Sequence, residues 1–173
     1  AIIQVIEPFL IKHMTEDTYS AIPERGTFKA YKKLVKALKS DPAGTRWCLK
    51  IDIKKYYPSI PKDKLKEKYE SLFKDKGILK LLFEIIDSTP GDKGIPIGNY
   101  ISQYSGNIYL SDFDHKVKED YKVKHYFRYM DDMVFLAKTK EELQLLVKKI
   151  IKFLKDVLGL EVKSGWSLFF VED

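Results

Sequence analysis

Apolar and polar residues alternate from Trp47 to Ile53, which is the pattern of a strand with one buried face. Asp52 comes at the end of this predicted strand. A second β-prone stretch, residues 126–136, carries apolar residues on both sides of an Asp-Asp pair. It predicts a hairpin with Met130 and Asp131 at its tip, where two neighbouring side chains can converge although in a regular strand they could not.

Helical spacing of apolar residues covers much of the remaining chain. Thr139 and Glu142 form a capping box that begins the last predicted helix, and Gly159 is expected to end it. The predicted helices are residues 2–14, 28–39, a helix that begins near residue 65 and ends at Gly77, and then 78–86, 99–118 and 139–158. Two short strands, residues 160–163 and 167–171, are predicted after them.

The order strand, helices, hairpin, helix, strand predicts an α+β fold with a ferredoxin-like β-α-β-β-α-β core. A partly helical N-terminal segment precedes this core. In that topology the first strand lies next to the hairpin, so Asp52 can approach Asp131 and Asp132. Many functions use the same topology, so the fold alone does not decide between them.

Composition narrows the class of protein. The chain has 173 residues, 45% of them hydrophobic and 32% charged, as in an ordinary globular domain. A net charge of +6 permits a polyanionic partner without requiring one. A single cysteine, Cys48, and three histidines without ligand spacing argue against a disulfide framework or a zinc site. Without a long apolar run or a signal peptide, we expect no membrane contact and a cytoplasmic location.

Asp52, Asp131 and Asp132 are the candidate catalytic residues. Converging carboxylates repel one another unless a cation lies between them, and an oxygen ligand set without His or Cys favours Mg²⁺ or Mn²⁺. Two such ions support in-line phosphoryl transfer. The alternative is that the Asp-Asp pair is an ordinary polar turn.

Three segments resemble the palm motifs of reverse transcriptases, in that family's order and separation. They are Ile-Asp-Ile-Lys-Lys-Tyr-Tyr-Pro-Ser-Ile at 51–60, Gly-Ile-Pro-Ile-Gly-Asn-Tyr-Ile-Ser-Gln at 94–103, and Tyr-Met-Asp-Asp at 129–132. Residues 158–163 resemble the next motif, and the resemblance covers nearly everything from about Arg25 onward. It implies a polymerase palm at residues 47–173 and a partial fingers segment at 1–46, with the thumb outside this chain.

The same resemblance implies an RNA-directed DNA polymerase, a nucleotidyltransferase that adds deoxynucleotides to a primer 3′-OH by two-metal catalysis. Its partners would be an RNA template, a DNA or RNA primer and dNTPs. A polymerase-like module that binds RNA or protein without turnover is an alternative. A nucleotide cyclase shares the topology, but its Gly-Gly-acidic signature is missing from this hairpin.

Residues 97–103 are most similar to the enzymes of diversity-generating retroelements, in which an aliphatic residue and Gly are followed after three residues by Ser-Gln. Retroviral and group II intron relatives usually carry Gln at the position of Ile97 and Pro at that of Gln103. The resemblance implies a bacterial or phage enzyme with an accessory nucleic-acid-binding protein, and one that is error-prone because Ile97 cannot hydrogen-bond the nucleotide. Group II intron, retron-like and abortive-infection enzymes remain alternatives.

The resemblance also assigns roles to single residues. Asp52 and Asp131 would be the main ligands of two Mg²⁺ ions, for which Mn²⁺ can substitute, with Asp132 as the third acid and the backbone of Ile53 completing a coordination shell. Tyr57 would be the steric gate that crowds a ribose 2′-OH, or else a core aromatic residue.

Tyr129 and Met130 would contact the primer-template. Arg25 would clamp the triphosphate, or else be a surface arginine of a turn, and Lys163 would protonate the departing pyrophosphate. Gly98 would let the backbone approach the nucleotide. The full set of expected nucleotide-binding residues is Arg25, Lys55, Tyr56, Tyr57, Ile97, Gly98, Gln103 and Lys163.

Overall fold

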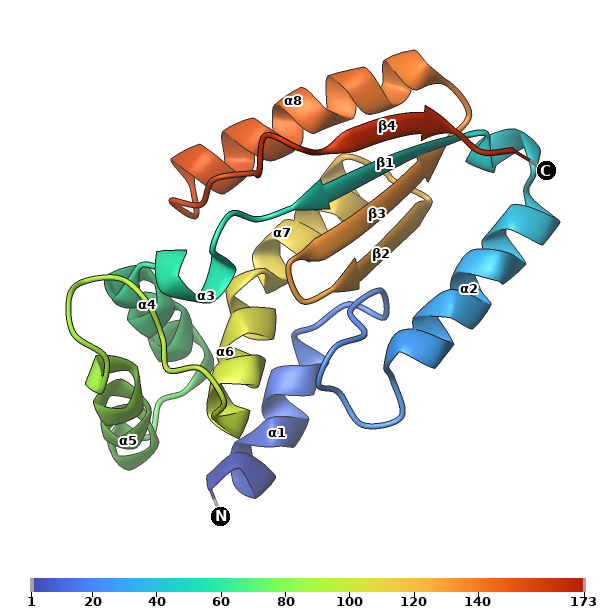
Figure 1. Ribbon diagram of the computed structural model, residues 1–173. Coiled ribbons are helices and arrows are strands. Elements are labelled where there is room, and N and C mark those ends of the chain that lie inside the picture. Colours follow the sequence, from blue (N-terminus) through green and yellow to red (C-terminus); the bar gives the residue numbers. More distant parts are fainter. Residues whose placement is uncertain (1, 173) are drawn as a thin grey trace.

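A four-stranded antiparallel sheet organises the molecule, and helices pack against both of its faces (Figure 1). The computed structural model describes residues 2–172. The order across the sheet is β2-β3-β1-β4, which is the ferredoxin-like order predicted from the sequence. The strands are β1 (Trp47–Asp52), β2 (His125–Tyr129), β3 (Asp132–Ala137) and β4 (Ser167–Phe170).

The helices fill the connections that the ferredoxin-like order requires. Between β1 and β2 the chain forms five helices and a short π-helical segment, η2, and between β3 and β4 it forms one long helix. The elements are α1 (Ile2–Lys12), α2 (Thr27–Ser40), η1 (Ala43–Thr45), α3 (Tyr56–Ser59), α4 (Lys62–Leu72), α5 (Lys76–Asp87), α6 (Tyr100–Tyr109), α7 (Ser111–His115), η2 (Lys116–Asp120) and α8 (Lys140–Asp156). No helix in residues 2–172 is long and apolar enough to cross a membrane.

The two faces of the sheet bury different clusters of residues. On one face Leu49, Ile51 and Phe135 belong to the main core, which α6, α7 and α8 complete. On the other face Cys48 and Leu136 belong to a smaller cluster that includes Tyr19, Ala37 and Phe127, so that α2 covers part of this face. The strand β1 is therefore buried on its apolar face, as predicted, while on its other face Cys48 is buried, Lys50 is exposed and Asp52 is half-buried.

The N-terminal helices pack directly onto this core. Helix α1 contacts α6, and α2 contacts β2. Residues 17–19 lie along the free edge of β2, where Thr18 and Arg128 form a parallel bridge. The partly helical N-terminal segment expected from the sequence is confirmed.

Three local predictions differ from the structure. Gly77 does not end a helix but lies in the first turn of α5, because the Asp75 carboxylate caps that helix by accepting the N–H groups of Gly77 and Ile78. The helix expected over residues 99–118 is interrupted at Leu110. Residues 160–163 form no strand; they make one antiparallel bridge, between Val162 and Ile53.

Candidate active site

The β2–β3 hairpin brings the three candidate acids to one end of the sheet. Met130 occupies the turn with a φ of 57°, a left-handed conformation that residues with side chains rarely adopt. In the register of the sheet, Asp52 of β1 is directly opposite Asp132 of β3. Directly opposite residues of antiparallel strands point to the same face, so these two carboxylates share a face, and Asp131 stands beside them on the turn.

The three acids influence one another electrostatically. Burial raises the pKa of Asp131, and the negative charges of Asp52 and Asp132 raise it further. The Asp52 Oδ2 atom accepts a hydrogen bond from the Lys163 ammonium, which raises the pKa of Lys163. The Asp52 Oδ1 atom is buried and has no hydrogen-bond partner. The cluster therefore contains an unsatisfied oxygen and more negative charge than Lys163 alone neutralises.

This donor set fits a hard divalent cation, although its side chains do not already surround one point. No three His, Cys, Asp or Glu side chains within residues 2–172 are arranged as a metal site. The unpartnered Asp52 Oδ1 and the exposed, rotatable Asp132 supply ligands of the type that Mg²⁺ prefers. The Ile53–Val162 bridge uses the Asp52 carbonyl and the Lys54 N–H, so its hydrogen bonds do not engage the Ile53 carbonyl.

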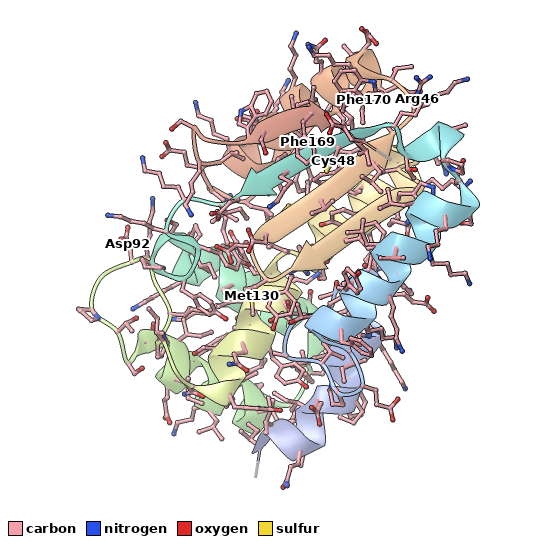
Figure 2. All side chains as sticks on the ribbon, turned by 45° about the vertical axis from the view of Figure 1, so that its right-hand side comes forward. Arg46, Cys48, Asp92, Met130, Phe169 and Phe170 are labelled. Atoms are coloured by element: carbon pink, nitrogen blue, oxygen red, sulfur yellow. The ribbon has the colours of Figure 1, made fainter. Side chains whose placement is uncertain are left out.

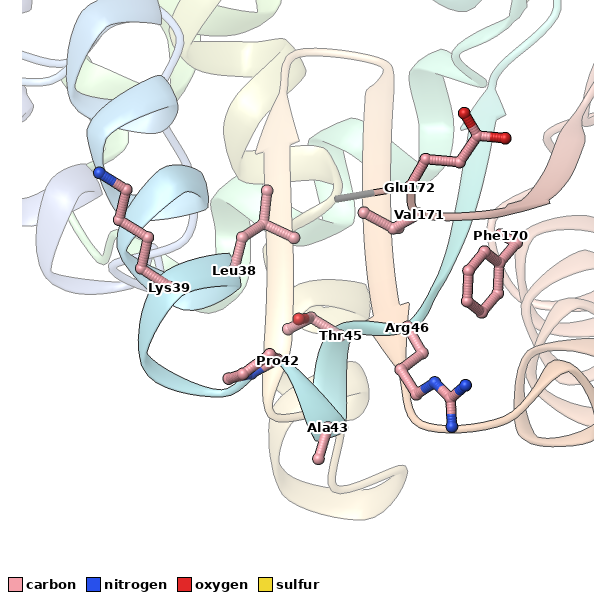
Figure 3. A pocket seen from close by; sticks show the side chains of 9 residues that line it. All are labelled: Leu38, Lys39, Pro42, Ala43, Thr45, Arg46, Phe170, Val171 and Glu172. Carbon is pink, nitrogen blue, oxygen red and sulfur yellow. The ribbon is translucent and has the colours of Figure 1, made fainter.

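A cavity of about 350 Å³ lies beside these acids and is lined by Asp52, Asp132, Lys163 and the turn at residues 164–167. A larger cavity of about 730 Å³ lies at the opposite end of the sheet, between α2 and the residues that follow β4 (Figure 3). Its lining contains a single carboxylate, Glu172, with Lys39 and Arg46. Of these two cavities, the smaller one is therefore the one that the candidate acids line.

Two tyrosines follow β1 and face the hairpin tip in different ways. Tyr56 is buried and donates a hydrogen bond to the Gly106 carbonyl at 2.6 Å, which leaves its backbone as the part able to meet a ligand. Tyr57 is half-buried, and its hydroxyl lies 3.4 Å from the Met130 sulfur. Burial and then the charge of Asp131 raise the pKa of Tyr57 to about 12. Lys55, with a φ of 47°, makes the left-handed step into α3.

Gly106 allows α6 to approach these side chains. A Cβ atom at this position would lie 3.0 Å from the Met130 sulfur and 3.5 Å from Tyr57 Cζ. Glycine at this position therefore permits close packing of α6 against Met130 and Tyr57.

The loop before α6 carries the next group of predicted residues. Ile97 is 77% exposed and Gly98 has a φ of 84°, while Gln103 lies half-buried in the helix. The loop is fastened to the segment after β1, since Ile95 N–H donates to the Tyr57 carbonyl at 3.3 Å. The structure thus connects the loop of Ile97 to the backbone of Tyr57.

Arg25 holds the turn before α2. Its guanidinium donates to the carbonyls of Thr15 at 2.7 Å and Thr18 at 2.9 Å. These contacts give Arg25 a structural role in this state; its contact with a triphosphate stays a prediction.

Sequence reasoning missed the buried network behind the turn. Arg128, Asp114 and Asn107 are all 0% exposed, and Arg128 makes a bidentate ion pair with Asp114. The sequence contained a signal for this network. Neighbouring side chains of a strand point to opposite faces, so Arg128 lies on the face of β2 that carries Tyr126 and packs into the main core, and Phe127 lies on the other face. A charged residue on a buried face requires a buried partner of opposite charge.

Comparison with known proteins agrees with the motifs. A family model described as reverse transcriptase (RNA-dependent DNA polymerase) matches residues 1–170. No curated protein matches the chain. Apo telomerase from Candida tropicalis, truncated from its C-terminal domain, is similar to it with a TM-score of 0.77 and 16% identity, over 99% of this chain and 40% of that one.

Two telomerases in complex with a TWJ fragment of telomeric RNA are similar as well, both with a TM-score of 0.74. The Candida tropicalis protein is 16% identical and the Candida albicans protein 14%, over 99% of this chain and 33% and 34% of theirs. Identities this low show a shared fold, and the chain spans well under half of each telomerase. The family model, which covers nearly the whole chain, shows more: this protein belongs to the reverse transcriptase family.

Proposed function

We propose that this chain is the fingers and palm core of an RNA-directed DNA polymerase, with fingers at residues 1–46 and palm at 47–173. The observation that carries the proposal is the pairing of Asp52 with Asp132 across β1 and β3, with Asp131 on the adjoining turn. Three acids at one end of the sheet, in a chain of this family, favour phosphoryl transfer over a purely structural turn.

Reverse transcriptases use divalent metal ions, and we infer that Asp52, Asp131, Asp132 and the Ile53 carbonyl hold two Mg²⁺ ions here. These ions, or Mn²⁺ in their place, would lower the pKa of the primer 3′-OH and neutralise charge on the phosphates. Lys163 carries its proton at neutral pH, as lysines ordinarily do, and would hold it at Nζ for the leaving pyrophosphate.

The substrate-binding residues lie around this cluster. The Tyr57 ring, held between Gly106 and Met130, would exclude a ribose 2′-OH. The backbone N–H groups of Lys55 and Tyr56 would meet the triphosphate, as Arg25 would from the fingers segment. Ile97, Gly98 and Gln103 would line the nucleotide site, and Tyr129, 42% exposed beside Met130, would contact the primer-template.

RNA template, DNA or RNA primer and dNTPs are the partners that this activity needs. The net charge of +6 suits a nucleic-acid partner, and two similar telomerases carry telomeric RNA fragments in their structures.

Primer extension on RNA and DNA templates, with the full-length parent protein, tests the activity. Asp131→Asn should abolish incorporation, whereas Asp92→Asn should not. Asp92 is exposed on the loop between α5 and α6, away from Met130 (Figure 2). Incorporation that survives Asp131→Asn would remove the assigned site. RNA binding without any incorporation by the wild type would instead support a polymerase-like binding module.

We further infer that the enzyme is of the diversity-generating retroelement type, with an accessory nucleic-acid-binding protein. The pattern Ile97-Gly98 followed by Ser102-Gln103 supports this subtype. Exposed Ile97 offers van der Waals contact but no hydrogen bond to an incoming nucleotide. Ile97→Gln should therefore lower the misincorporation frequency on an RNA template, measured by sequencing the products. An unchanged error frequency would speak against the mutagenic subtype.

A further inference from the structure

Arg128 is the largest fully buried side chain in residues 2–172. Its charge is matched by Asp114 of α7, with Arg128 Nε 2.8 Å from Oδ1 and Nη2 2.5 Å from Oδ2. Tyr126 also donates to Asp114 Oδ1, at 2.7 Å. A buried charge persists in a fold when it is paired and fully hydrogen-bonded, so this ion pair is a rigid point inside the molecule.

The remaining donors of Arg128 reach the hairpin turn. Nη1 donates to the Met130 carbonyl at 2.9 Å and to Asn107 Oδ1 at 3.1 Å, and Nη2 donates to the Asn107 carbonyl at 3.2 Å. The guanidinium therefore joins α6 and α7 to the turn between β2 and β3. A planar group with this many fixed partners cannot rotate without breaking several hydrogen bonds.

The backbone of Arg128 is held as firmly as its side chain. Its N–H donates to the Asp17 carbonyl at 2.8 Å, and its carbonyl accepts the N–H of Tyr19 at 3.0 Å. Residues 17–19 thus fix the outer edge of β2 close to the turn. Through these bonds the N-terminal segment supports the hairpin from the side opposite β3.

The Met130 carbonyl is the atom through which this support reaches the acids. The peptide group is planar, so the direction of this carbonyl fixes the N–H and Cα of Asp131. The left-handed conformation of Met130 is unfavourable for a residue with a side chain and persists only where surrounding contacts impose it. The hydrogen bond from Arg128 is one such contact.

We propose that Arg128 is a positioning residue for the candidate active site. It holds the Met130–Asp131 peptide in the left-handed turn and thereby keeps Asp131 beside Asp52 and Asp132. The inference rests on the proposed function for its catalytic consequence, while the geometry itself is independent of it.

Methionine-methyl NMR tests the inference on this chain. The sequence has three methionines, Met14, Met130 and Met133, so the Met130 signal reports the turn, the Met133 signal reports the position directly opposite Arg128 on β3, and the Met14 signal reports packing elsewhere. In Arg128→Lys the ammonium cannot reach both Asp114 and the Met130 carbonyl, so the Met130 signal should shift or broaden. The concentration of Mn²⁺ that broadens it should rise roughly tenfold or more, as happens when groups that orient metal ligands are lost.

Tyr126→Phe is the matched control. It removes one hydrogen bond from Asp114 and leaves the bond between Arg128 and Met130, so it should lower the unfolding midpoint without altering the Met130 signal or the Mn²⁺ response. An unchanged Met130 signal in Arg128→Lys would overturn the inference, as would an equal change in Tyr126→Phe. Asp52→Asn tests the proposed metal site separately: an unaltered Mn²⁺ response in this variant would contradict that site. The role of Arg128 would then be decided by the Met130 signal recorded without metal.

A measurement on the wild type serves if Arg128→Lys does not fold. The chain has three arginines, Arg25, Arg46 and Arg128, so their Nη–H signals can be assigned. A guanidinium held as the structure shows gives separate, slowly exchanging Nη–H signals, whereas exposed Arg46 should give averaged ones. Averaged signals for Arg128 would overturn the inference.

Discussion

At the scale of single residues, the acids and the tyrosines could be anticipated from the sequence, and the residues that hold them could not. Asp52, Asp131 and Asp132 stand out because strand, turn and motif place them together. Nothing local marks Asp114 or Asn107 as partners of Arg128, because their contacts span 14 and 21 positions of the chain. Long-range buried pairs depend on the packing of several elements at once, which a local pattern does not encode.

Gly106 gives a prediction at this scale. In Gly106→Ala the new Cβ meets the Met130 sulfur at 3.0 Å and displaces it. Alanine in a helix is more favourable than glycine by about 1 kcal/mol, and crowding in a core costs about 1–3 kcal/mol, so the free energy of unfolding should fall by about 2 kcal/mol at most. Nucleotide incorporation should fall by more than this small loss of stability would cause, because the crowded atoms lie next to Tyr57 and the turn. Urea unfolding and primer extension measure the two effects.

Gly77→Ala is the control for this substitution, since it makes the same change in the first turn of α5, where a Cβ atom meets only the side chain of Asp75. Equal loss of incorporation in both variants would show that the packing of α6 against Met130 is not what the activity needs.

Tyr57 gives a second prediction at the residue scale. Tyr57→Ala should raise the incorporation of ribonucleotides relative to deoxynucleotides, because the ring that crowds the 2′-OH is removed. Tyr57→Phe keeps the ring and loses only the hydroxyl contact with the Met130 sulfur, so its selectivity should stay close to that of the wild type. Competition between rATP and dATP in primer extension measures the ratio, and equal ratios in Tyr57→Ala and the wild type would exclude the gate.

At the scale of elements, helices with explicit end signals were predicted well. The capping box predicted at Thr139 and Glu142 is confirmed, with both reciprocal hydrogen bonds present. Gly77 was misread because a glycine after an apolar run is typical of a helix end, while Asp75 two positions earlier marks a helix start. In place of the strand expected at residues 160–163 the structure has a single bridge. Strand β4 pairs with β1 only up to Lys50, and the one pairing made by residues 160–163 is the bridge between Val162 and Ile53.

The capping box leads to a prediction for α8. Thr139→Ala removes the acceptor for the Glu142 N–H, whose oxygen lies 3.2 Å away, and should lower the free energy of unfolding by about 1 kcal/mol. Urea denaturation followed by circular dichroism measures this loss. Lys138→Ala, one position earlier and outside the capping box, should change it by less; equal losses would show that the cap contributes nothing specific.

At the scale of the whole molecule, the sheet is secured at both ends by polar contacts between distant segments. Arg128 does this near the acids. At the other end Asp41, just after α2, accepts hydrogen bonds from Gly44 N–H at 3.0 Å, Lys124 Nζ at 2.7 Å and His125 Nε2 at 2.9 Å. The sequence pattern does not mark Asp41 for this role, because its partners Lys124 and His125 lie more than 80 positions away.

Asp41 therefore predicts how stability depends on pH. Its hydrogen bonds with His125, Lys124 and Gly44 lower its pKa in the folded state below the 3.8 expected without them. A lowered carboxyl pKa contributes stability that is fully present above the unfolded-state pKa and is lost as the pH falls through the folded-state value. The free energy of unfolding should fall between pH 5 and pH 2, and it should fall less in Asp41→Asn, which has no carboxyl to protonate.

Urea unfolding at pH 6, 4 and 3 measures how the free energy of unfolding depends on pH in the wild type and in Asp41→Asn. Asp92→Asn, which changes an exposed aspartate, is the control that should keep the wild-type dependence. Parallel loss in the wild type and Asp41→Asn would mean that other carboxylates carry the acid sensitivity and that Asp41 does not secure this end of the sheet.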